Sequence, residues 1–271
     1  MKIAILDAYN LMHRARFGMQ FGDHHIIFNF FRGLRPIIEE LAPDKIFLVL
    51  EGFPAHRHAV DSSYKANRLI DETSPKWQEL QEFRRQKTAI LDIVKMLPIT
   101  VIRHPHLECD DVAASIALSH ADDDCVIVST DTDFIQLLTS PKIKLYNPVT
   151  KSFVQQYPHD YLTWKSLRGD KTDNVPPIPG MSDRKATLML EQPGAFTKAM
   201  LDDDFRAAFD KNMSLIKFQV IPSDDPLIES QSYQANWPGL RNSLTDLKFA
   251  AIVKDGSWQK YVETFKSIYD D

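Results

Sequence analysis

The chain has 271 residues and a formal net charge of −5, and 44% of its residues are hydrophobic and 25% charged. These proportions are ordinary for a soluble globular protein. No apolar run approaches the roughly 20 residues that a membrane-spanning helix needs, which excludes a membrane-spanning chain. Two cysteines, Cys109 and Cys125, fit neither a disulfide framework nor a zinc site, so we expect a reducing, cytoplasmic setting.

Short apolar runs alternate with longer stretches of helical spacing in the first part of the chain. Such alternation predicts a doubly wound α/β fold with a mostly parallel sheet. In chain order we expect a strand at 3–6, a helix at 25–41, a strand at 46–50, a helix at 75–97, a strand at 100–102, a helix at 112–118, a strand at 126–128 and a weaker strand at 143–146.

The pattern changes after about residue 150, where no further strand is expected. The tail from Ala195 has the spacing of helices with loops, and residues 222–238 are expected to be irregular. We therefore expect two parts that pack together, an α/β core over residues 1–160 and a second part over residues 161–271 that contains a helix-turn-helix-like stretch and C-terminal helices. A stretch early in the second part is typical of short helices joined by a turn, and its punctuating residues are Pro176, Pro177, Pro179 and Gly180.

Acidic side chains follow three of the expected strands, at the point where each strand ends. Asp7 follows the first strand, Glu51 the second and Asp131 the fourth. Because the carboxyl ends of parallel strands meet at one edge of a sheet, these three carboxylates should converge. Further acids follow nearby or open a helix after the third strand, namely Glu108, Asp110, Asp111, Asp133, Asp170 and Asp173.

Nine carboxylates at one edge would repel each other and raise one another's pKa values. Mg²⁺ and Mn²⁺ remove this repulsion because they prefer oxygen ligands, and two such ions roughly 4 Å apart suit phosphodiester hydrolysis. The set therefore favours a metal site. Each acid alone also fits a structural role, as a residue that favours a helix N-terminus (Asp110, Asp111), a helix cap (Asp131) or a solvated group (Asp170, Asp173).

The net charge is weak evidence against a nucleic-acid partner. Without these nine acids the chain has 32 basic and 28 acidic residues, a balance of +4. Divalent ions would neutralise much of the acidic set, so DNA binding stays compatible with the composition.

Four segments together resemble the 5′ nuclease or flap endonuclease family, especially its bacterial and phage members. They lie within roughly residues 1–190, and their order and spacing both match. The segments are Asp7-Ala8-Tyr9-Asn10-Leu11-Met12-His13-Arg14; Glu51-Gly52-Phe53 with Arg57 and Tyr64-Lys65-Ala66-Asn67-Arg68; Glu108-Cys109-Asp110-Asp111 with Ser129-Thr130-Asp131-Thr132-Asp133; and Gly169-Asp170-Lys171-Thr172-Asp173-Asn174-Val175-Pro176 with Pro179-Gly180-Met181.

The resemblance implies a PIN-like α/β core joined to a helix-hairpin-helix variant called the H3TH motif, with C-terminal helices. It also implies two metal ions, Mg²⁺ or Mn²⁺. Glu51 departs from the family, which usually has aspartate there. One ion would be served by Asp7, Glu51, Glu108 and Asp110, the other by Asp131, Asp133, Asp170 and Asp173, and Asp111 is a further member of the metal set.

Two sets of cations would handle DNA near the metal site, according to the same resemblance. Lys65 and Arg68 match the family's basic pair, which steers the scissile phosphate and stabilises transition-state charge. Residues 69–95 fall where the family has a helical arch over the site. A charged amphipathic helix gives the same pattern, so both interpretations stay open for the cations that would grip a single strand there, Arg84, Arg85 and Lys87.

The hairpin at Gly180 and Ser182 would hold duplex phosphates without reading bases, through backbone N–H groups together with Arg184 and Lys185. Similar hairpins in the family bind potassium through backbone carbonyls, so the resemblance implies a K⁺ site. Ser182 stands where a second glycine is common, which counts against that site.

The implied activities are 5′→3′ exonuclease and flap endonuclease on DNA with 5′ ends, flaps or junctions, together with RNase H-like primer removal from RNA–DNA hybrid. The resemblance further implies a monomer that works with replication proteins in a bacterial cell or phage-infected host, without a membrane partner. Two alternatives stay open. The segment 165–190 argues against a PIN-type ribonuclease, and the complete carboxylates with Lys65 and Arg68 argue against a non-catalytic DNA binder.

Overall fold

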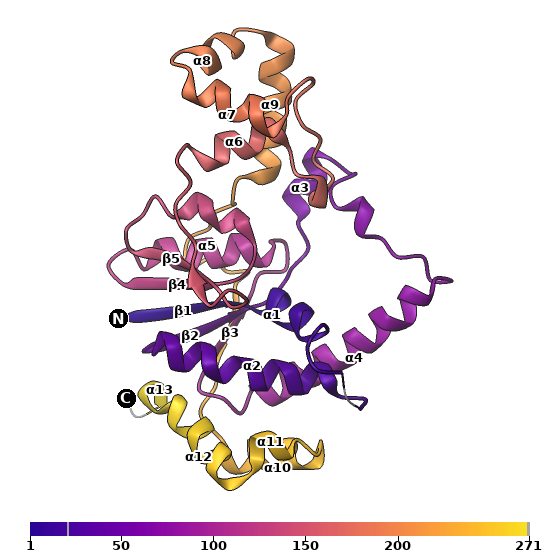
Figure 1. Cartoon of the computed structure of the whole chain (residues 1–271), viewed down its shortest axis with the longest axis vertical. Helices are drawn as coiled ribbons and strands as arrows, with labels where there is room; N and C mark the ends of the chain where they lie inside the picture. Colours follow the sequence, from indigo (N-terminus) through magenta and orange to yellow (C-terminus); the bar gives the residue numbers. More distant parts are fainter. Residues whose placement is uncertain (21, 270–271) are drawn as a thin grey trace.

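A seven-stranded sheet forms the centre of the computed structural model, which describes residues 1–20 and 22–269 (Figure 1). The strands lie in the order β6-β5-β4-β1-β2-β3-β7. The five inner strands run parallel, and β6 and β7 pair antiparallel at the edges. The expected α/β fold with a mostly parallel sheet is confirmed. Its strands are β1 (Lys2–Asp7), β2 (Lys45–Val49), β3 (Thr100–Arg103), β4 (Asp124–Val128), β5 (Ile143–Asn147), β6 (Ser152–Phe153) and β7 (Glu229–Ser232).

Helices cover both faces of the sheet, because successive side chains of a buried strand point to opposite sides. In β1, Ala4 and Leu6 pack on the side of α2 and α4, whereas Ile3 and Ile5 pack on the side of α5. All four side chains are fully buried. The helices of this first part of the chain are α1 (Ala8–Ala15), α2 (His25–Leu41), α3 (Ala55–Val60), α4 (Pro75–Val94) and α5 (Cys109–Ser119), with the short 3-10 helices η1 (Ala66–Arg68) and η2 (Thr132–Leu137).

Two strands lie where the sequence predicts none, so the expectation that strands stop after residue 150 is wrong. β6 extends the sheet beyond β5, and β7 lies within residues 222–238, which were expected to be irregular. β7 consists of exposed polar residues, which hydrophobic periodicity cannot detect. Backbone pairing with β3 holds it, together with a 2.9 Å hydrogen bond between the Thr100 and Ser232 hydroxyls.

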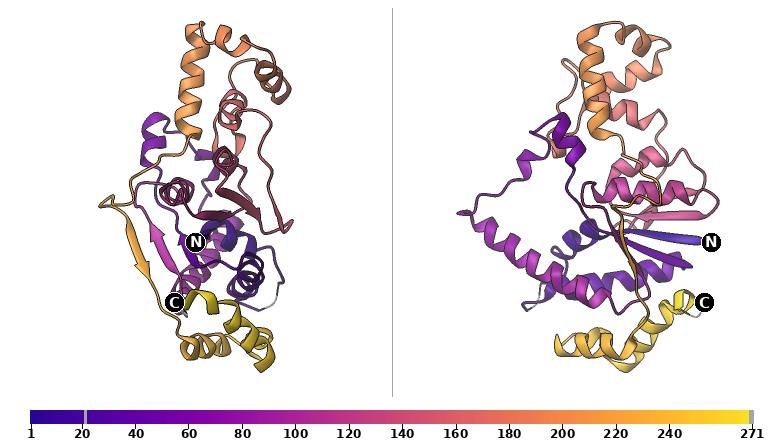
Figure 2. Two further views of the ribbon diagram at one scale, coloured as in Figure 1. Left: turned by 90° about the vertical axis from the view of Figure 1, so that its left-hand side faces the viewer. Right: turned by 180° about the vertical axis from the view of Figure 1, so that it is seen from behind.

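Two helical groups follow residue 160 in the described part of the chain. The first group lies at one end of the molecule, and the chain then passes along the sheet edge as β7 to a second group at the opposite end (Figure 2). The second group packs on α2, where Phe28 and Phe249 make edge-to-face contact. The first group contains α6 (Tyr161–Arg168), η3 (Lys171–Asp173), α7 (Asp183–Glu191), α8 (Ala195–Ala199) and α9 (Asp203–Ile216); the second contains α10 (Trp237–Asp246), α11 (Ala250–Val253), α12 (Asp255–Thr264) and α13 (Lys266–Tyr269).

Among the described residues, no helix has both the length and the apolar character that crossing a bilayer requires.

Candidate metal and nucleic-acid site

The sheet register brings the acids of three strands to one edge. Asp7, the last residue of β1, pairs in register with Val49 of β2, and Leu6 pairs with Val128 of β4. Glu51 and Asp131 follow those two strands within three residues and therefore lie at the same edge.

Gly52 allows the loop after β2 to lie against the loop before α5. A Cβ atom at this position would overlap the carbonyl oxygens of His104 and Leu107. A glycine is therefore required for this close approach, which places Glu51 beside the start of α5. There the Cys109 N–H donates to Glu51 Oε2 over 3.2 Å.

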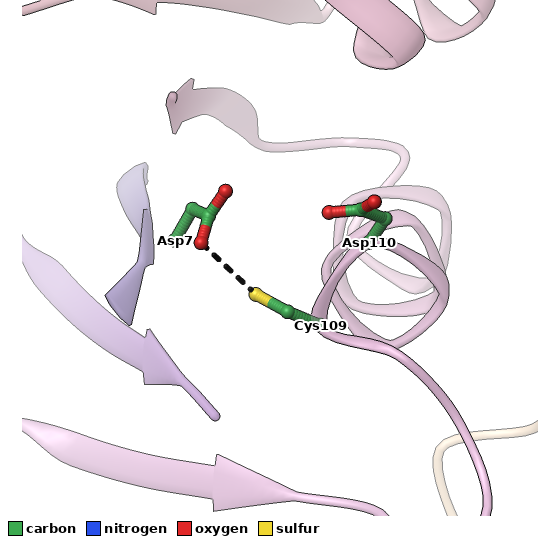
Figure 3. Close-up of side chains that lie close together, drawn as sticks. All are labelled: Asp7, Cys109 and Asp110. Atoms are coloured by element: carbon green, nitrogen blue, oxygen red, sulfur yellow. Dashed lines mark hydrogen bonds between the residues drawn. The ribbon is translucent and has the colours of Figure 1, made fainter. Parts of the chain in front are cut away.

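Asp7, Cys109 and Asp110 form a first group of metal-ligand atoms (Figure 3). One such atom from each residue lies within 4.8 Å of the other two. In Figure 3 the Asp7 and Asp110 carboxylates face one another from the end of β1 and the start of α5. Ser129 Oγ donates to Asp7 Oδ2 over 2.8 Å, and Cys109 Sγ donates to Asp7 Oδ1 over 3.5 Å.

The acids around this group have raised pKa values. Burial is the main cause for Asp7, Glu51 and Asp110, and neighbouring carboxylates add to it. The pKa of Glu51 is raised to about 7. Burial also raises the pKa of the Cys109 thiol well above its ordinary value, which keeps it protonated. Crowded, ionisable oxygen donors of this kind fit a hard divalent cation, which stabilises their charged forms.

Asp133, Asp170 and Asp173 form a second group, again with one carboxylate oxygen of each within 4.8 Å of the others. Asp131 lies next to them, and its carboxylate accepts the Asp133 N–H at 2.9 Å, which caps η2. Burial raises the pKa of Asp131, and the charges of Asp173 and Asp170 add to this effect against that of Lys165. The structure thus brings the four predicted acids of the second set together.

Lys165 belongs to this group although the sequence patterns did not single it out. Its buried ammonium pairs with Asp133 and, at 2.7 Å, with Asp170 Oδ2. Burial alone would raise the pKa of Asp170, but Lys165 and hydrogen bonds from Thr172 lower it to about 2. The sequence does contain a signal for this role. Lys165 lies one turn after Tyr161 on the buried face of α6, and a lysine on a buried helix face needs an acidic partner.

Lys65 and Arg68 pair with one acid from each of the two predicted metal-ligand sets. Lys65 pairs with Glu108 and lies 3.8 Å from Asp173 Oδ2, and Arg68 pairs with Asp173. The backbone of Lys65 has φ 56°, in the left-handed region that residues other than glycine rarely adopt. Its N–H donates to the Asp173 carbonyl over 2.9 Å, which fastens this turn to η3. Strain of this kind is typical of residues held in place for function.

Asp111 is in neither group, and the expectation that it binds metal is not supported. Its two carboxylate oxygens accept hydrogen bonds from the Arg57 guanidinium at 2.5 and 2.8 Å, and one also accepts the Gln219 N–H at 2.9 Å. Asp111 further completes a capping box with Glu108 at the start of α5. Its lone pairs are engaged within the protein, so we omit it from the ligand set.

The segment expected as an arch, residues 69–95, swings away from the core and returns along α4, whose C-terminal half packs on α2 (Figure 1). Lys87 is directed toward α1, with its ammonium 5.4 Å from the centre of the Tyr9 ring. Arg84 lies over a tryptophan ring of α4 itself, and Arg85 pairs with a glutamate one turn earlier. Of these three cations, Lys87 is thus the one placed beside α1.

Aromatic rings of α1 and of the turn that follows it form a row beside α4. Tyr9, His13 and Phe17 are spaced four residues apart, with ring centres 6.1 and 5.6 Å from one ring to the next. Tyr9 and His13 also contact Phe83 of α4, and the Arg16 guanidinium lies over the Phe83 ring. Burial and the charge of Arg16 lower the pKa of His13, which favours its neutral form. This aromatic row starts two residues after Asp7, so it leads away from the first acid group.

The expected hairpin joins η3 to α7 in the first helical group. Gly180 has φ 76°, and Ser182 caps α7 by accepting the Lys185 N–H. The Lys185 ammonium donates to the Gly180 carbonyl over 2.8 Å, and Arg184 is exposed nearby. An ammonium therefore already binds a carbonyl of the turn where K⁺ was expected, so we do not carry the K⁺ site forward.

Comparison with known proteins identifies one matching family. The profile of the family described as 5′-3′ exonuclease, N-terminal resolvase-like domain, matches residues 2–164. DNA polymerase I of Treponema pallidum is 31% identical over 208 residues, which are 69% of this chain and 20% of that protein. The chain spans about a fifth to a third of the length of the curated relatives it matches.

Solved structures share the fold over nearly the whole chain. Bacteriophage T5 5′-exonuclease with bound zinc ions gives a TM-score of 0.67 at 15% identity, and the match covers 98% of this chain and 99% of that one. A variant of bacteriophage T5 flap endonuclease in complex with DNA and metal ions gives a TM-score of 0.64 at 16% identity, with the same coverage.

Proposed function

The chain belongs to the family of 5′-3′ exonuclease N-terminal domains, and on that premise we propose that it is a structure-specific 5′ nuclease that hydrolyses DNA at 5′ ends and flap junctions. One observation carries the proposal: two groups of carboxylates converge at one sheet edge, and the paired cations Lys65 and Arg68 reach into them. Acids that bind metal and cations that bind phosphate are the parts that phosphodiester hydrolysis requires.

Two divalent ions, Mg²⁺ or Mn²⁺, would be held by oxygen ligands at this edge. When bound, such ions activate a water molecule and neutralise charge on the phosphodiester. Asp110 lies beside Asp7 and within the influence of Asp131, a position that suits a ligand close to both ions. We assign Asp7, Glu51, Glu108 and Asp110 to the first ion and Asp131, Asp133, Asp170 and Asp173 to the second.

Lys65 and Arg68 would bind the scissile phosphate. Each now pairs with a carboxylate, Lys65 with Glu108 and Arg68 with Asp173. A phosphate entering between the acid groups offers both cations a new anionic partner. Arginine can bind it bidentately and lysine as a point charge, so the two side chains would orient it and stabilise charge that develops during hydrolysis.

DNA would reach the site as a single strand on one side and as a duplex on the other. The aromatic row on α1, together with Lys87, combines stacking surfaces with positive charge, as single-strand sites do. The Gly180 turn with Arg184 and Lys185 opens α7, where exposed N–H groups and cations suit duplex phosphates. RNA primers paired to DNA are a second proposed substrate.

A cleavage assay tests the proposal. We expect a 5′-labelled flap to be cut near its junction in Mg²⁺ and to stay intact in EDTA, and a matched 3′ flap to be cut far more slowly. An RNA flap on DNA tests primer removal. Binding of the 5′ flap without cleavage in any divalent metal would favour a non-catalytic DNA binder instead, and cleavage of single-stranded RNA alone would favour a PIN-type ribonuclease.

A further inference from the structure

We propose that Arg57 is a positioning residue that holds one oxygen of Glu108, so that the other oxygen faces the candidate metal site. The inference rests on the proposed nuclease function. Arg57 lies in α3 and is 3% exposed. It is outside the set of acids and cations that the sequence singled out for chemistry, yet it contacts one of those acids directly.

The two oxygens of Glu108 have different partners. Oε2 lies 2.8 Å from Arg57 Nη1 and 3.0 Å from the Tyr64 hydroxyl, which is shared with Asp173 Oδ2, also at 3.0 Å; Arg57 and Tyr64 are both buried. Oε1 pairs with Lys65, whose side chain is 17% exposed. When Lys65 turns to a substrate phosphate, Oε1 loses that partner, while Oε2 keeps Arg57 and the shared Tyr64 hydroxyl. Arg57 and Tyr64 therefore present Oε1 as the oxygen available to a cation.

Arg57 is itself fixed by contacts with the C-terminal end of α9 and with the segment that follows it. Its Nε donates to the Leu215 carbonyl over 2.7 Å, and its two terminal nitrogens bind Asp111. Asp111 also accepts the Gln219 N–H at 2.9 Å. The buried Arg57–Asp111 pair thus fastens the segment after α9 to α5, the helix that carries Asp110. Movement of the first helical group would therefore shift the Arg57 guanidinium and, with it, the Glu108 carboxylate.

This arrangement requires an arginine. Its planar group engages both oxygens of Asp111 and still meets Glu108, which a lysine ammonium cannot reproduce. The charges of Asp111 and Glu108 raise the pKa of Arg57 against the opposing effect of burial, so it stays charged. A neutral replacement would leave buried carboxylates unpaired and would destabilise the fold strongly. The informative substitution therefore keeps the charge and changes the geometry.

Arg57→Lys is the test variant, and Ser115→Ala is its matched control. Ser115 Oγ accepts the Ile221 N–H at 3.1 Å, so it fastens the same segment to α5 without contacting Glu108. Tyr64→Phe removes the hydroxyl that Glu108 Oε2 shares with Asp173 Oδ2. Four measurements are made on each full-length variant: Mn²⁺ binding by electron paramagnetic resonance without DNA, binding of an uncut flap in Ca²⁺, single-turnover cleavage in Mg²⁺, and thermal unfolding.

We expect Arg57→Lys to weaken Mn²⁺ binding and slow cleavage by roughly tenfold or more, with flap affinity within about threefold of wild type. Tyr64→Phe should act in the same direction with a smaller effect, and Ser115→Ala should leave Mn²⁺ binding unchanged. A lower melting temperature with unaltered Mn²⁺ binding in Arg57→Lys would overturn the proposal, as would equal weakening in Ser115→Ala.

If Arg57→Lys does not fold, Tyr64→Phe decides the matter, since unchanged Mn²⁺ binding in that variant also contradicts the proposal. Measurements on the wild-type protein separate the proposed nuclease function from the proposed role of Arg57. Failure of that protein to cleave any flap would count against the nuclease function, whereas Mn²⁺ binding tests the positioning of Glu108 by itself.

Discussion

The ammonium of Lys165 lies 2.7 Å from Asp170 Oδ2, in a buried ion pair that also includes Asp133. Lys165 therefore supplies positive charge inside the second group of acids and helps to lower the pKa of Asp170 to about 2. A divalent ion at this group must share or displace that charge. We therefore expect the second group to bind a divalent ion more weakly than the first.

Lys165→Met should destabilise the metal-free protein and increase its response to Mg²⁺. The substitution removes the ammonium but keeps an apolar stem, so buried carboxylates lose their partner at a cost of about 3 kcal/mol. Mg²⁺ can replace the lost charge and should restore much of this stability. Urea unfolding in EDTA and in excess Mg²⁺ measures both effects. Lys171→Met, at an exposed lysine of η3, is the control, and an equal Mg²⁺ response in both variants would contradict the prediction.

The stability of the metal-free protein should fall as pH rises from about 4.5 to 7. Burial, with the charges of Glu108 and Asp7, raises the pKa of Glu51 from 4.5 to about 7 in the folded chain. In this window the folded chain holds a proton that the unfolded chain has released, so raising the pH favours unfolding. Mg²⁺ binds the ionised form, so its affinity should rise over the same window.

Urea unfolding in EDTA and Mg²⁺ titrations at several pH values test these opposite trends. Glu51→Gln removes this titrating group and should reduce the slope of both pH profiles, while Asp7, Asp110 and Asp131, whose pKa values are also raised, still contribute. Equal slopes of stability against pH in the wild-type protein and in Glu51→Gln between about 5 and 7 would contradict the raised pKa of Glu51.

Asp131→Asn should abolish cleavage while DNA binding persists. The amide oxygen can still accept the Asp133 N–H, so the cap of η2 is retained, whereas the charge offered to a metal ion is lost. We expect cleavage to slow by at least about a hundredfold. Single-turnover assays in Mg²⁺ and anisotropy with a flap in Ca²⁺ separate the two properties. Asp122→Asn, at an exposed acid before β4, should behave as wild type; near-normal turnover in Asp131→Asn would mean that the site lies elsewhere.

The sequence was sufficient for the acids whose positions follow from local rules. Asp7, Glu51 and Asp131 each come within three residues of an apolar run that forms a parallel strand, and the shared direction of the strands brings them together. Of the helices between the strands, α2, α4 and α5 lie on stretches whose helical spacing predicted them, whereas α1 and α3 were not predicted.

The features that the sequence did not predict depend on contacts between distant parts of the chain. Arg57 meets Asp111 across 54 positions and Leu215 across 158. Asp110 and Asp111 are indistinguishable in the sequence. In the fold, the Asp110 side chain faces Asp7, whereas the Asp111 side chain faces the Arg57 guanidinium. β7 has no apolar residue, so pairing with β3 determines its conformation.

Phe17→Ala should weaken binding of a flap with a long 5′ single strand by about tenfold, because stacking one base on an aromatic ring contributes about 1–3 kcal/mol. Phe17 ends the aromatic row on the side away from Asp7 and is 75% exposed, so its removal should change the melting temperature little. Anisotropy in Ca²⁺ compares this flap with a nicked duplex that has no single strand, for which affinity should be unchanged. Phe153→Ala, at a 43% exposed ring on the edge strand β6, is the control. An equal loss on both substrates, or none on the flap, would place the single strand away from α1.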